Sequence, residues 1–391
     1  MNRLFTLSVL FLGSVLISNA QPAIEWQYSY GGTQTDGMFQ GNGGREHIQP
    51  TSDGGFVVAS TSYSNDGDVS GHHGSTGTSD YWIFKIDSLG GIEWENSFGG
   101  TGDETVNNIQ CTSDGGCIIV GETLSNDGDV TGFHGTDLTK SDVWVLKLDS
   151  LGNIEWEQAY GGGGNEWGRA ILETVDGGFV FVGGSDSTDG DVSGLHALSD
   201  IWFAKIDAGG SLLWQHCYGG SSFEHGRNVR QTNDNGFIIA GNTSSSDGDA
   251  FGNTDTFALG GTWVIKTDSL GNIEWQDTYG GSLFEFGNDC WNTPDGNYFM
   301  GASTTSTDGQ VTATHHGSFD YWVLKLDNTG GVIWNECYGG TQGDELHSMK
   351  LTNDGGFVAI GQSSSSDIDV SSNNGGFDYW LIKADSSGNL Q

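Results

Sequence analysis

The chain has 391 residues and a formal net charge of −38, because 51 acidic residues stand against 13 basic ones. Such a surface repels nucleic acid and anionic membranes, and it suits cations or partners that present basic patches. The sequence has 66 glycines but three prolines, and its 14 tryptophans and 20 phenylalanines indicate a packed core rather than low-complexity disorder.

Residues 1–20 have the features of a secretory signal peptide. Arg3 supplies a positive start, residues 4–17 form an apolar stretch, and Ser18-Asn19-Ala20 offers small residues for cleavage. The apolar stretch is short for a membrane span. We therefore expect residues 21–391 to be exported, with no insertion into a membrane.

A cassette of about 60 residues recurs six times in the rest of the chain. Its core phrase is Asp, an aromatic residue, Trp, two apolar residues and Lys, as in residues 80–85 and 378–383. The tryptophans of this phrase are Trp82, Trp144, Trp202, Trp263, Trp322 and Trp380. A unit that recurs so evenly buries its apolar surface by stacking on its neighbours.

One copy shows the strands that the cassette predicts. Residues 228–232, 237–241, 263–268 and 273–279 are rich in β-branched or aromatic residues and are separated by Gly, Asn and Asp turns. They predict a four-stranded antiparallel meander. The second and third segments are apolar on both faces, so each sheet must be covered on both sides, as in a β-propeller. A nonapeptide β-helix is excluded because its period is far shorter.

The two ends of the chain complete the blade count. Residues 24–30 have the sequence of a fourth strand without the three strands before it, and the last cassette reaches Gln391 where its fourth strand would begin. We therefore predict an all-β fold over residues 21–391. It is a six-bladed β-propeller of four-stranded antiparallel blades, closed by residues 24–30 pairing beside residues 379–384.

Residues 53–59 (Asp-Gly-Gly-Phe-Val-Val-Ala), 80–87 and 152–156 (Gly-Asn-Ile-Glu-Trp) carry a family resemblance. They resemble the delta-60-like repeats of bacterial exported β-propeller proteins, many of which are similar to cargo of the type IX secretion pathway. Some of these proteins are labelled endoglucanase-like. The resemblance implies a propeller that is secreted or held at the surface or in the periplasm of a bacterium. Type IX cargo usually continues into a C-terminal sorting domain, so we expect either that domain to be missing here or another export route.

The loop after the second strand of each copy carries an acidic turn. The aspartate pairs of the first four copies are Asp66, Asp68, Asp127, Asp129, Asp189, Asp191, Asp247 and Asp249. Such pairs can present oxygens to Ca²⁺, the one cofactor that the sequence predicts, although their spacing departs from an EF-hand. The alternative is that they form Asx turns that only shape the loop.

Several of these loops also hold histidines, for which loop packing is favoured over a Zn²⁺ site. They are His72, His73, His134, His196, His315 and His316.

A second acidic position opens the first strand of each copy. It holds Glu104, Glu166, Glu224, Glu285 and Asp344, with Asp36 or Glu46 as the equivalent in the first copy, where residues 37–43 are inserted. We expect these carboxylates to ring the mouth of the central channel. Two of them could perform glycosidase chemistry. Symmetric copies favour structure instead, because catalysis needs two carboxylates in different environments. No catalytic residue is assigned.

Lysines and cysteines complete the set of candidate residues. The six lysines of the core phrase are expected to pair with aspartates such as Asp53 and Asp87 or their repeat equivalents, because a lysine within an apolar strand needs a partner. Cys111 and Cys117 flank a tight turn, and they either form a disulfide or remain two buried thiols.

These features favour a non-enzymatic propeller that binds a glycan, a surface protein or cations through its acidic loop face. The alternative is a carbohydrate-active enzyme, an endoglucanase-like glycoside hydrolase that uses the channel-mouth carboxylates. A third is a structural spacer. Four aromatic residues that depart from the repeat are either sugar contacts or packing between blades. They are Trp167, Phe223, Phe284 and Trp291.

Overall fold

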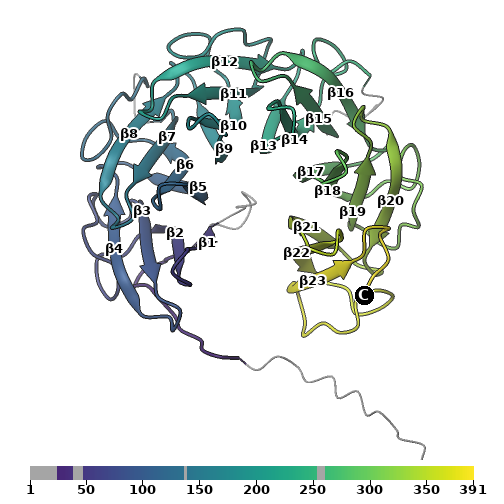
Figure 1. Cartoon of the computed structure of the whole chain (residues 1–391), viewed down its shortest axis with the longest axis horizontal. Helices are drawn as coiled ribbons and strands as arrows, with labels where there is room; N and C mark the ends of the chain where they lie inside the picture. Colours follow the sequence, from purple (N-terminus) through teal and green to yellow (C-terminus); the bar gives the residue numbers. More distant parts are fainter. Residues whose placement is uncertain (1–23, 38–46, 136–138, 253–259) are drawn as a thin grey trace, which may run out of the picture.

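Each cassette folds as an antiparallel sheet, and the six sheets stand as blades around a common axis (Figure 1). This computed structural model describes residues 24–37, 47–135, 139–252 and 260–391. The predicted signal at residues 1–20 lies outside the described residues, as does Glu46. Within the described ranges all regular elements are β-strands. No helix there is long and apolar enough to cross a membrane. The six-bladed β-propeller predicted from the sequence is confirmed.

The strands follow the cassette in order, and the first strand of each blade lies nearest the axis (Figure 1). Blade 1 contains β1 (Ile48–Pro50), β2 (Phe56–Ser62), β3 (Asp80–Ile86) and β4 (Ile92–Phe98). Blade 2 contains β5 (Glu104–Cys111), β6 (Cys117–Thr123), β7 (Asp142–Leu148) and β8 (Ile154–Tyr160). Blade 3 contains β9 (Glu166–Glu173), β10 (Phe179–Ser185), β11 (Asp200–Ile206) and β12 (Leu212–Tyr218). Blade 4 contains β13 (Glu224–Gln231), β14 (Phe237–Thr243), β15 (Gly261–Thr267) and β16 (Ile273–Tyr279). Blade 5 contains β17 (Glu285–Asn292), β18 (Tyr298–Thr304), β19 (Asp320–Leu326) and β20 (Val332–Tyr338). Blade 6 contains β21 (Asp344–Leu351), β22 (Phe357–Ser363) and β23 (Asp378–Ala384).

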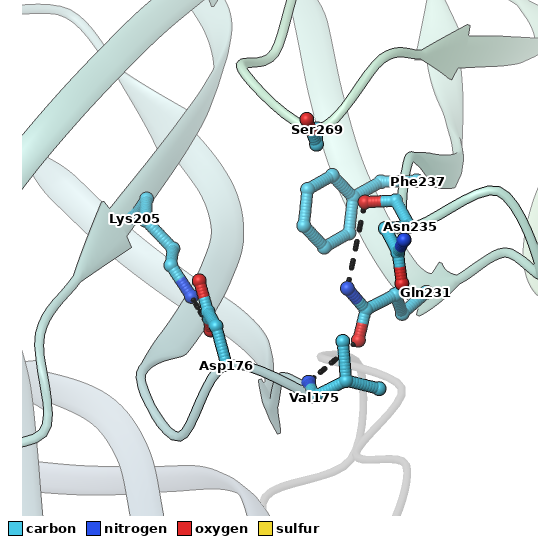
Figure 2. Close-up of a pocket in the computed structure, with 7 residues that line it drawn as sticks. All are labelled: Val175, Asp176, Lys205, Gln231, Asn235, Phe237 and Ser269. Atoms are coloured by element: carbon cyan, nitrogen blue, oxygen red, sulfur yellow. Dashed lines mark hydrogen bonds and ion pairs between the residues drawn. The ribbon is translucent and has the colours of Figure 1, made fainter.

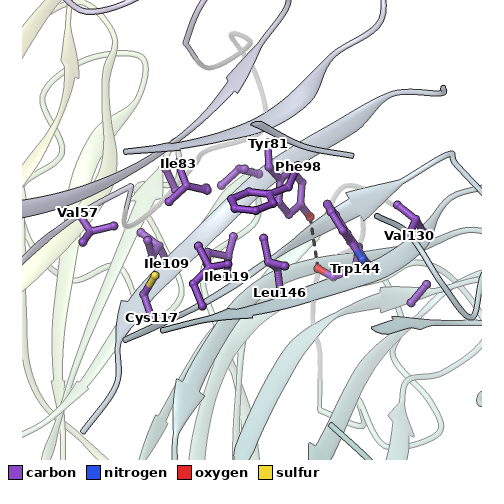
Figure 3. Close-up of a cluster of buried hydrophobic side chains, with 14 residues drawn as sticks. Val57, Tyr81, Ile83, Phe98, Ile109, Cys117, Ile119, Val130, Trp144 and Leu146 are labelled. Carbon is purple, nitrogen blue, oxygen red and sulfur yellow. Dashed lines mark hydrogen bonds between the residues drawn. The ribbon is translucent and has the colours of Figure 1, made fainter. Parts of the chain in front are cut away.

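The core lies between consecutive blades. Between blades 1 and 2, Tyr81, Ile83, Ile119, Trp144 and Leu146 are all fully buried (Figure 3). The rings of Tyr81 and Trp144 lie 4.6 Å apart, and the Tyr81 hydroxyl donates to the Trp144 carbonyl at 3.3 Å. The core-phrase tryptophan therefore joins each blade to the one before it. This packing explains why the second and third strands are apolar on both faces.

The predicted closure by the N-terminal segment is not seen as strand pairing. Among the described residues, β23 has no fourth strand beside it apart from an isolated bridge between Ala384 and Leu390. Tyr379 is 91% exposed, whereas its counterpart Tyr81 is 0% exposed. Blade 6 therefore has three strands and an uncovered apolar face.

Residues 24–30 nevertheless lie where a fourth strand would contact blade 1. Trp26 Nε1 donates to the Ser88 carbonyl at 2.9 Å, and the Tyr30 hydroxyl donates to the Gly90 carbonyl at 2.6 Å. The same two contacts join β8 to blade 3, through Trp156 to Ala208 and Tyr160 to Gly210. Residues 24–30 thus contact blade 1, and their predicted pairing beside β23 stays a prediction.

Cys111 and Cys117 are free thiols and do not form a disulfide. Cys111 and Cys117 lie directly opposite each other in the register of β5 and β6, as a cross-strand disulfide would require. Both are nevertheless free, and burial raises the pKa of Cys117 to about 12. A thiol with so high a pKa is almost entirely protonated at neutral pH and is a poor nucleophile.

Candidate functional site

The acidic residues predicted at the channel mouth do open the innermost strands, but their side chains are buried. Each is 0% exposed: Glu104, Glu166, Glu224, Glu285 and Asp344. This differs from the expectation of an open ring of carboxylates. The sequence locates the position in the strand, whereas the side to which the carboxylate turns depends on the loops that cover it.

Each buried carboxylate organises the connection between two blades. Glu104 accepts hydrogen bonds from the Gly100 amide at 2.9 Å and the Thr123 hydroxyl at 2.8 Å. In blade 1 the matching carboxylate is Asp36, which bonds the Gly32 amide and the hydroxyls of Ser62 and Ser64. Of the two equivalents suggested by the sequence, the structure therefore identifies Asp36. A buried carboxylate with several donors is a structural element of the loop.

Three of the six loop histidines bridge two aspartates across a blade junction. His134 lies 3.1 Å from Asp142 through Nδ1 and 3.6 Å from Asp191 through Nε2. Equivalent bridges join His73 to Asp80 and Asp129, and His196 to Asp200 and Asp249. His316 approaches Asp320 at 3.7 Å.

The blade 4 copy lacks the loop histidine, and the usual aspartate partners are absent there as well. Between blades 4 and 5, Gly261 stands in place of the strand aspartate, Gln310 in place of the loop aspartate, and the loop from 244 to 261 contains no histidine. Blade 6 also lacks a loop histidine, yet it keeps Asp378, which accepts a hydrogen bond from the Asn374 amide instead. The bridges to aspartates support the loop-packing interpretation of the histidines.

The paired loop aspartates also have defined internal partners. The first member bonds the turn of the preceding connection: Asp127 accepts from the Thr101 amide at 2.8 Å. The second member, Asp129, accepts from the Gly99 amide at 3.2 Å. Gln310 makes the same bond to the Gly280 amide at 3.0 Å without a charge. The position thus requires a hydrogen-bond acceptor, and that acceptor holds the preceding connection rather than its own turn.

Calcium binding by these loops stays a prediction. Among the residues that the structure describes, no group of three or more His, Cys, Asp or Glu side chains is arranged to hold a metal ion. The sequence predicts that millimolar Ca²⁺ raises the melting temperature more than Mg²⁺ does, since calcium tolerates irregular oxygen ligands. Thermal scans at fixed ionic strength check this. Equal shifts with Ca²⁺, Mg²⁺ and matched NaCl would contradict it.

The core-phrase lysines pair with the turn aspartates, as predicted. Lys147 Nζ lies 2.9 Å from Asp114 and 2.7 Å from Glu155, and the remaining lysines repeat the aspartate contact. The pairs are Lys85–Asp53, Lys205–Asp176, Lys266–Asp234, Lys325–Asp295 and Lys383–Asp354. The Asp87 alternative is not used, because its carboxylate accepts the amides of Leu89 and Gly91 in its own turn. The lysines are therefore structural.

The buried carboxylates make stability depend on pH. Burial raises the pKa of Glu104 from 4.5 to about 7 and that of Asp320 from 3.8 to about 7. Burial also raises the pKa values of Asp142, Glu166 and Asp200. A raised pKa in the folded state favours the protonated form, so this stabilisation is complete below the unfolded pKa and is lost as pH rises through the folded pKa.

We therefore expect the free energy of unfolding to fall between pH 4.5 and pH 7, by about 1–3 kcal/mol per affected carboxyl group. Urea unfolding at constant ionic strength measures the change. Glu104→Gln is the matched control, because it should reduce the slope while leaving overall charge repulsion nearly unchanged. A stability that rises over this range, or an identical slope in the variant, would contradict the assignment.

Two surface grooves are lined by elements that recur in other blades. A groove of about 310 Å³ lies between blades 3 and 4 (Figure 2). On one wall Lys205 pairs with Asp176 at 2.6 Å, and Gln231 accepts from the Val175 amide at 3.0 Å. Its charged groups thus neutralise each other. A second groove of about 330 Å³ includes His316, Asp369 and Leu390 at the edge of blade 6.

The positions at which the copies differ lie on the innermost strands, and the sequence reasoning missed them. In each of β5, β9, β13, β17 and β21 a β-bulge shifts the register by one residue. The bulged residues are Asn107, Arg169, Arg227, Asn288 and His347. Bulges commonly redirect a side chain beside a functional site. Aligning the copies would have revealed this position, since it holds Asn, Arg or His in different copies.

A second variable position lies two residues before the bulge. It holds Thr105, Trp167, His225, Phe286 and Glu345. The Trp167 and His225 rings lie 5.5 Å apart on neighbouring blades, and Phe286 stacks on Phe284 at 6.3 Å. Of the other predicted aromatic contacts, Phe223 is 50% exposed, and Trp291 lies 4.1 Å below the Arg230 guanidinium. The variable surface is thus aromatic on blades 3 to 5.

Comparison with known proteins finds only distant structural similarities. No family model and no curated protein matches the sequence. Among solved structures, a Bacteroides caccae protein of unknown function is 11% identical over 74% of this chain and 80% of that chain, with a TM-score of 0.40. A Xanthomonas campestris gluconolactonase is 8% identical over 72% and 78%, with a TM-score of 0.38. Sqt1 from Chaetomium thermophilum is 10% identical over 90% and 72%, with a TM-score of 0.41. None of these values transfers an activity to this chain.

Proposed function

We propose that this protein is an exported, non-catalytic binding module whose ligand is a glycan or a surface protein. The binding surface is formed by the variable residues of the innermost strands rather than by the acidic loops. The observation that carries the proposal is the break in symmetry: the frame repeats in every blade, whereas the bulge position changes from Asn to Arg to His. Asymmetric side chains on a rigid, repeated scaffold are typical of a binding site.

The glycosidase alternative fits the geometry less well. A glycosidase needs two carboxyl groups that flank the scissile bond and differ in environment. The repeated carboxylates are fully buried, and Glu104 and its equivalents accept the same loop hydrogen bonds in each blade. Such groups cannot reach a polysaccharide without unfolding of the loops above them.

A combined binding and turnover screen tests the proposal. The purified protein is applied to a glycan array, and the same preparation is incubated with plant and bacterial polysaccharides. We expect binding to at least one saccharide or cell-surface protein and no new reducing ends. Release of reducing ends in proportion to protein concentration would contradict the proposal and favour the glycoside hydrolase.

A further inference from the structure

Two guanidinium groups stand on neighbouring innermost strands in a strongly acidic protein. Arg169 and Arg227 occupy the bulge positions of β9 and β13. Arg169 has a carboxylate partner, since its Nη1 lies 3.1 Å from Glu122 and donates to Asn107 at 3.0 Å. Arg227 makes no ion pair or hydrogen bond with the residues that the structure describes, and its Nε is buried.

The charge on Arg227 is therefore uncompensated in the described part of the chain. Burial and the nearby Arg169 lower the pKa of Arg227 to about 10, so the group remains a cation at neutral pH. Burial and the two arginines lower the pKa of His225 to about 4, so this imidazole is neutral there. A partly buried cation is normally paired, because leaving it unpaired costs several kcal/mol.

Aromatic rings lie beside the two arginines. Trp167 precedes Arg169 on β9 and contacts His225 of β13 across the blade junction. The indole occupies space left by Gly184, where a Cβ atom would lie 2.5 Å from Trp167 Nε1. The slot for the ring therefore depends on glycine, and any side chain at residue 184 would displace the indole. Flat aromatic faces beside a guanidinium suit a sugar ring that carries an acidic group.

We propose that Trp167, Arg169, His225 and Arg227 bind the carboxylate or sulfate group of an acidic saccharide. This inference rests on the proposed binding function and specifies its ligand class. Arg227 offers the paired N–H donors that match a carboxylate or sulfate, and Trp167 stacks on the sugar ring. The net charge of −38 repels a dense polyanion such as nucleic acid, so a few acidic groups on a neutral ring fit best.

Titration calorimetry with four probes tests the inference: a uronic acid oligosaccharide, a sulfated oligosaccharide, the neutral oligosaccharide of matched length, and inorganic sulfate. The variants are Arg227→Gln, Arg227→Lys and, as a matched loss of charge elsewhere, the loop variant Lys140→Gln. We expect an acidic oligosaccharide to bind, more tightly than the neutral one or free sulfate. Arg227→Gln should weaken this binding about tenfold or more, Arg227→Lys should weaken it less, and Lys140→Gln should leave it unchanged.

Stability distinguishes a ligand-binding arginine from a structural one. Because Arg227 has no described partner, Arg227→Gln should melt at the same temperature as the wild type or higher. A lower melting temperature together with unchanged affinity would overturn the inference. Equal binding of the neutral and acidic oligosaccharides, unaffected by Arg227→Gln, would also overturn it while leaving a binding module. Cleavage of any probe would instead overturn the proposed function.

Discussion

Deleting residues 24–30 should destabilise the propeller strongly, by at least the 3–5 kcal/mol typical of removing one large aromatic side chain. Trp26 and Tyr30 make the contacts to Ser88 and Gly90 that fourth strands make elsewhere in the ring. They also cover the cluster around Trp82 and Phe84 of blade 1. If the segment also pairs with β23, its loss opens the ring completely.

Urea unfolding measures the loss of stability. Amide hydrogen exchange of residues 379–384 tests the pairing with β23. Pairing predicts slow exchange of β23 amides in the full chain and fast exchange after the deletion. Tyr28→Ala is the matched control, because Tyr28 is 61% exposed and lies in the same segment. Fast exchange in both proteins would show that residues 24–30 only cover blade 1. Unchanged stability would contradict both the cover of blade 1 and the pairing with β23.

Trp144→Ala should cost about 3–5 kcal/mol of the free energy of unfolding. Trp144 is fully buried between blades 1 and 2, stacks on Tyr81, and donates through Nε1 to Glu157 at 2.8 Å. The substitution leaves a cavity at a blade junction and removes one of the donors to Glu157. Its effect should therefore exceed that of most single substitutions.

Chemical unfolding of the variant measures this cost, with Leu151→Ala as the surface control. Leu151 is 70% exposed, so its truncation should change stability by less than about 0.5 kcal/mol. Similar losses in both variants would contradict the assignment of the core to the blade junctions.

The sequence predicts those parts of the molecule that repeat. Regular spacing of the core phrase determines the number of blades, and Gly/Asn/Asp turns locate the strands. Asn235 adopts a positive φ of 65° in a turn that the sequence identified. The lysine pairs follow from strand direction, because a lysine on the third strand lies beside the turn that connects the first two. In each case a local rule acts in every copy.

The candidate site depends on features that local rules do not determine. Glu104 opens its strand where predicted, yet the loops that cover it decide that it is buried. A bulge skips Arg227 in the ladder, and this shift depends on the register between two strands. The pairing of residues 24–30 with β23 joins the two ends of the chain, so no nearby residue specifies it. The proposed binding function depends on these departures from the repeat.

The most direct test of the central claim is hydrogen exchange with and without the tightest-binding saccharide from the array. We predict that the ligand slows exchange in β9 and β13, which carry Trp167, Arg169, His225 and Arg227, and leaves the acidic loops at residues 125–130 and 187–192 unchanged. Protection of those loops, with no change in β9 or β13, would contradict the assignment of the binding surface to the innermost strands.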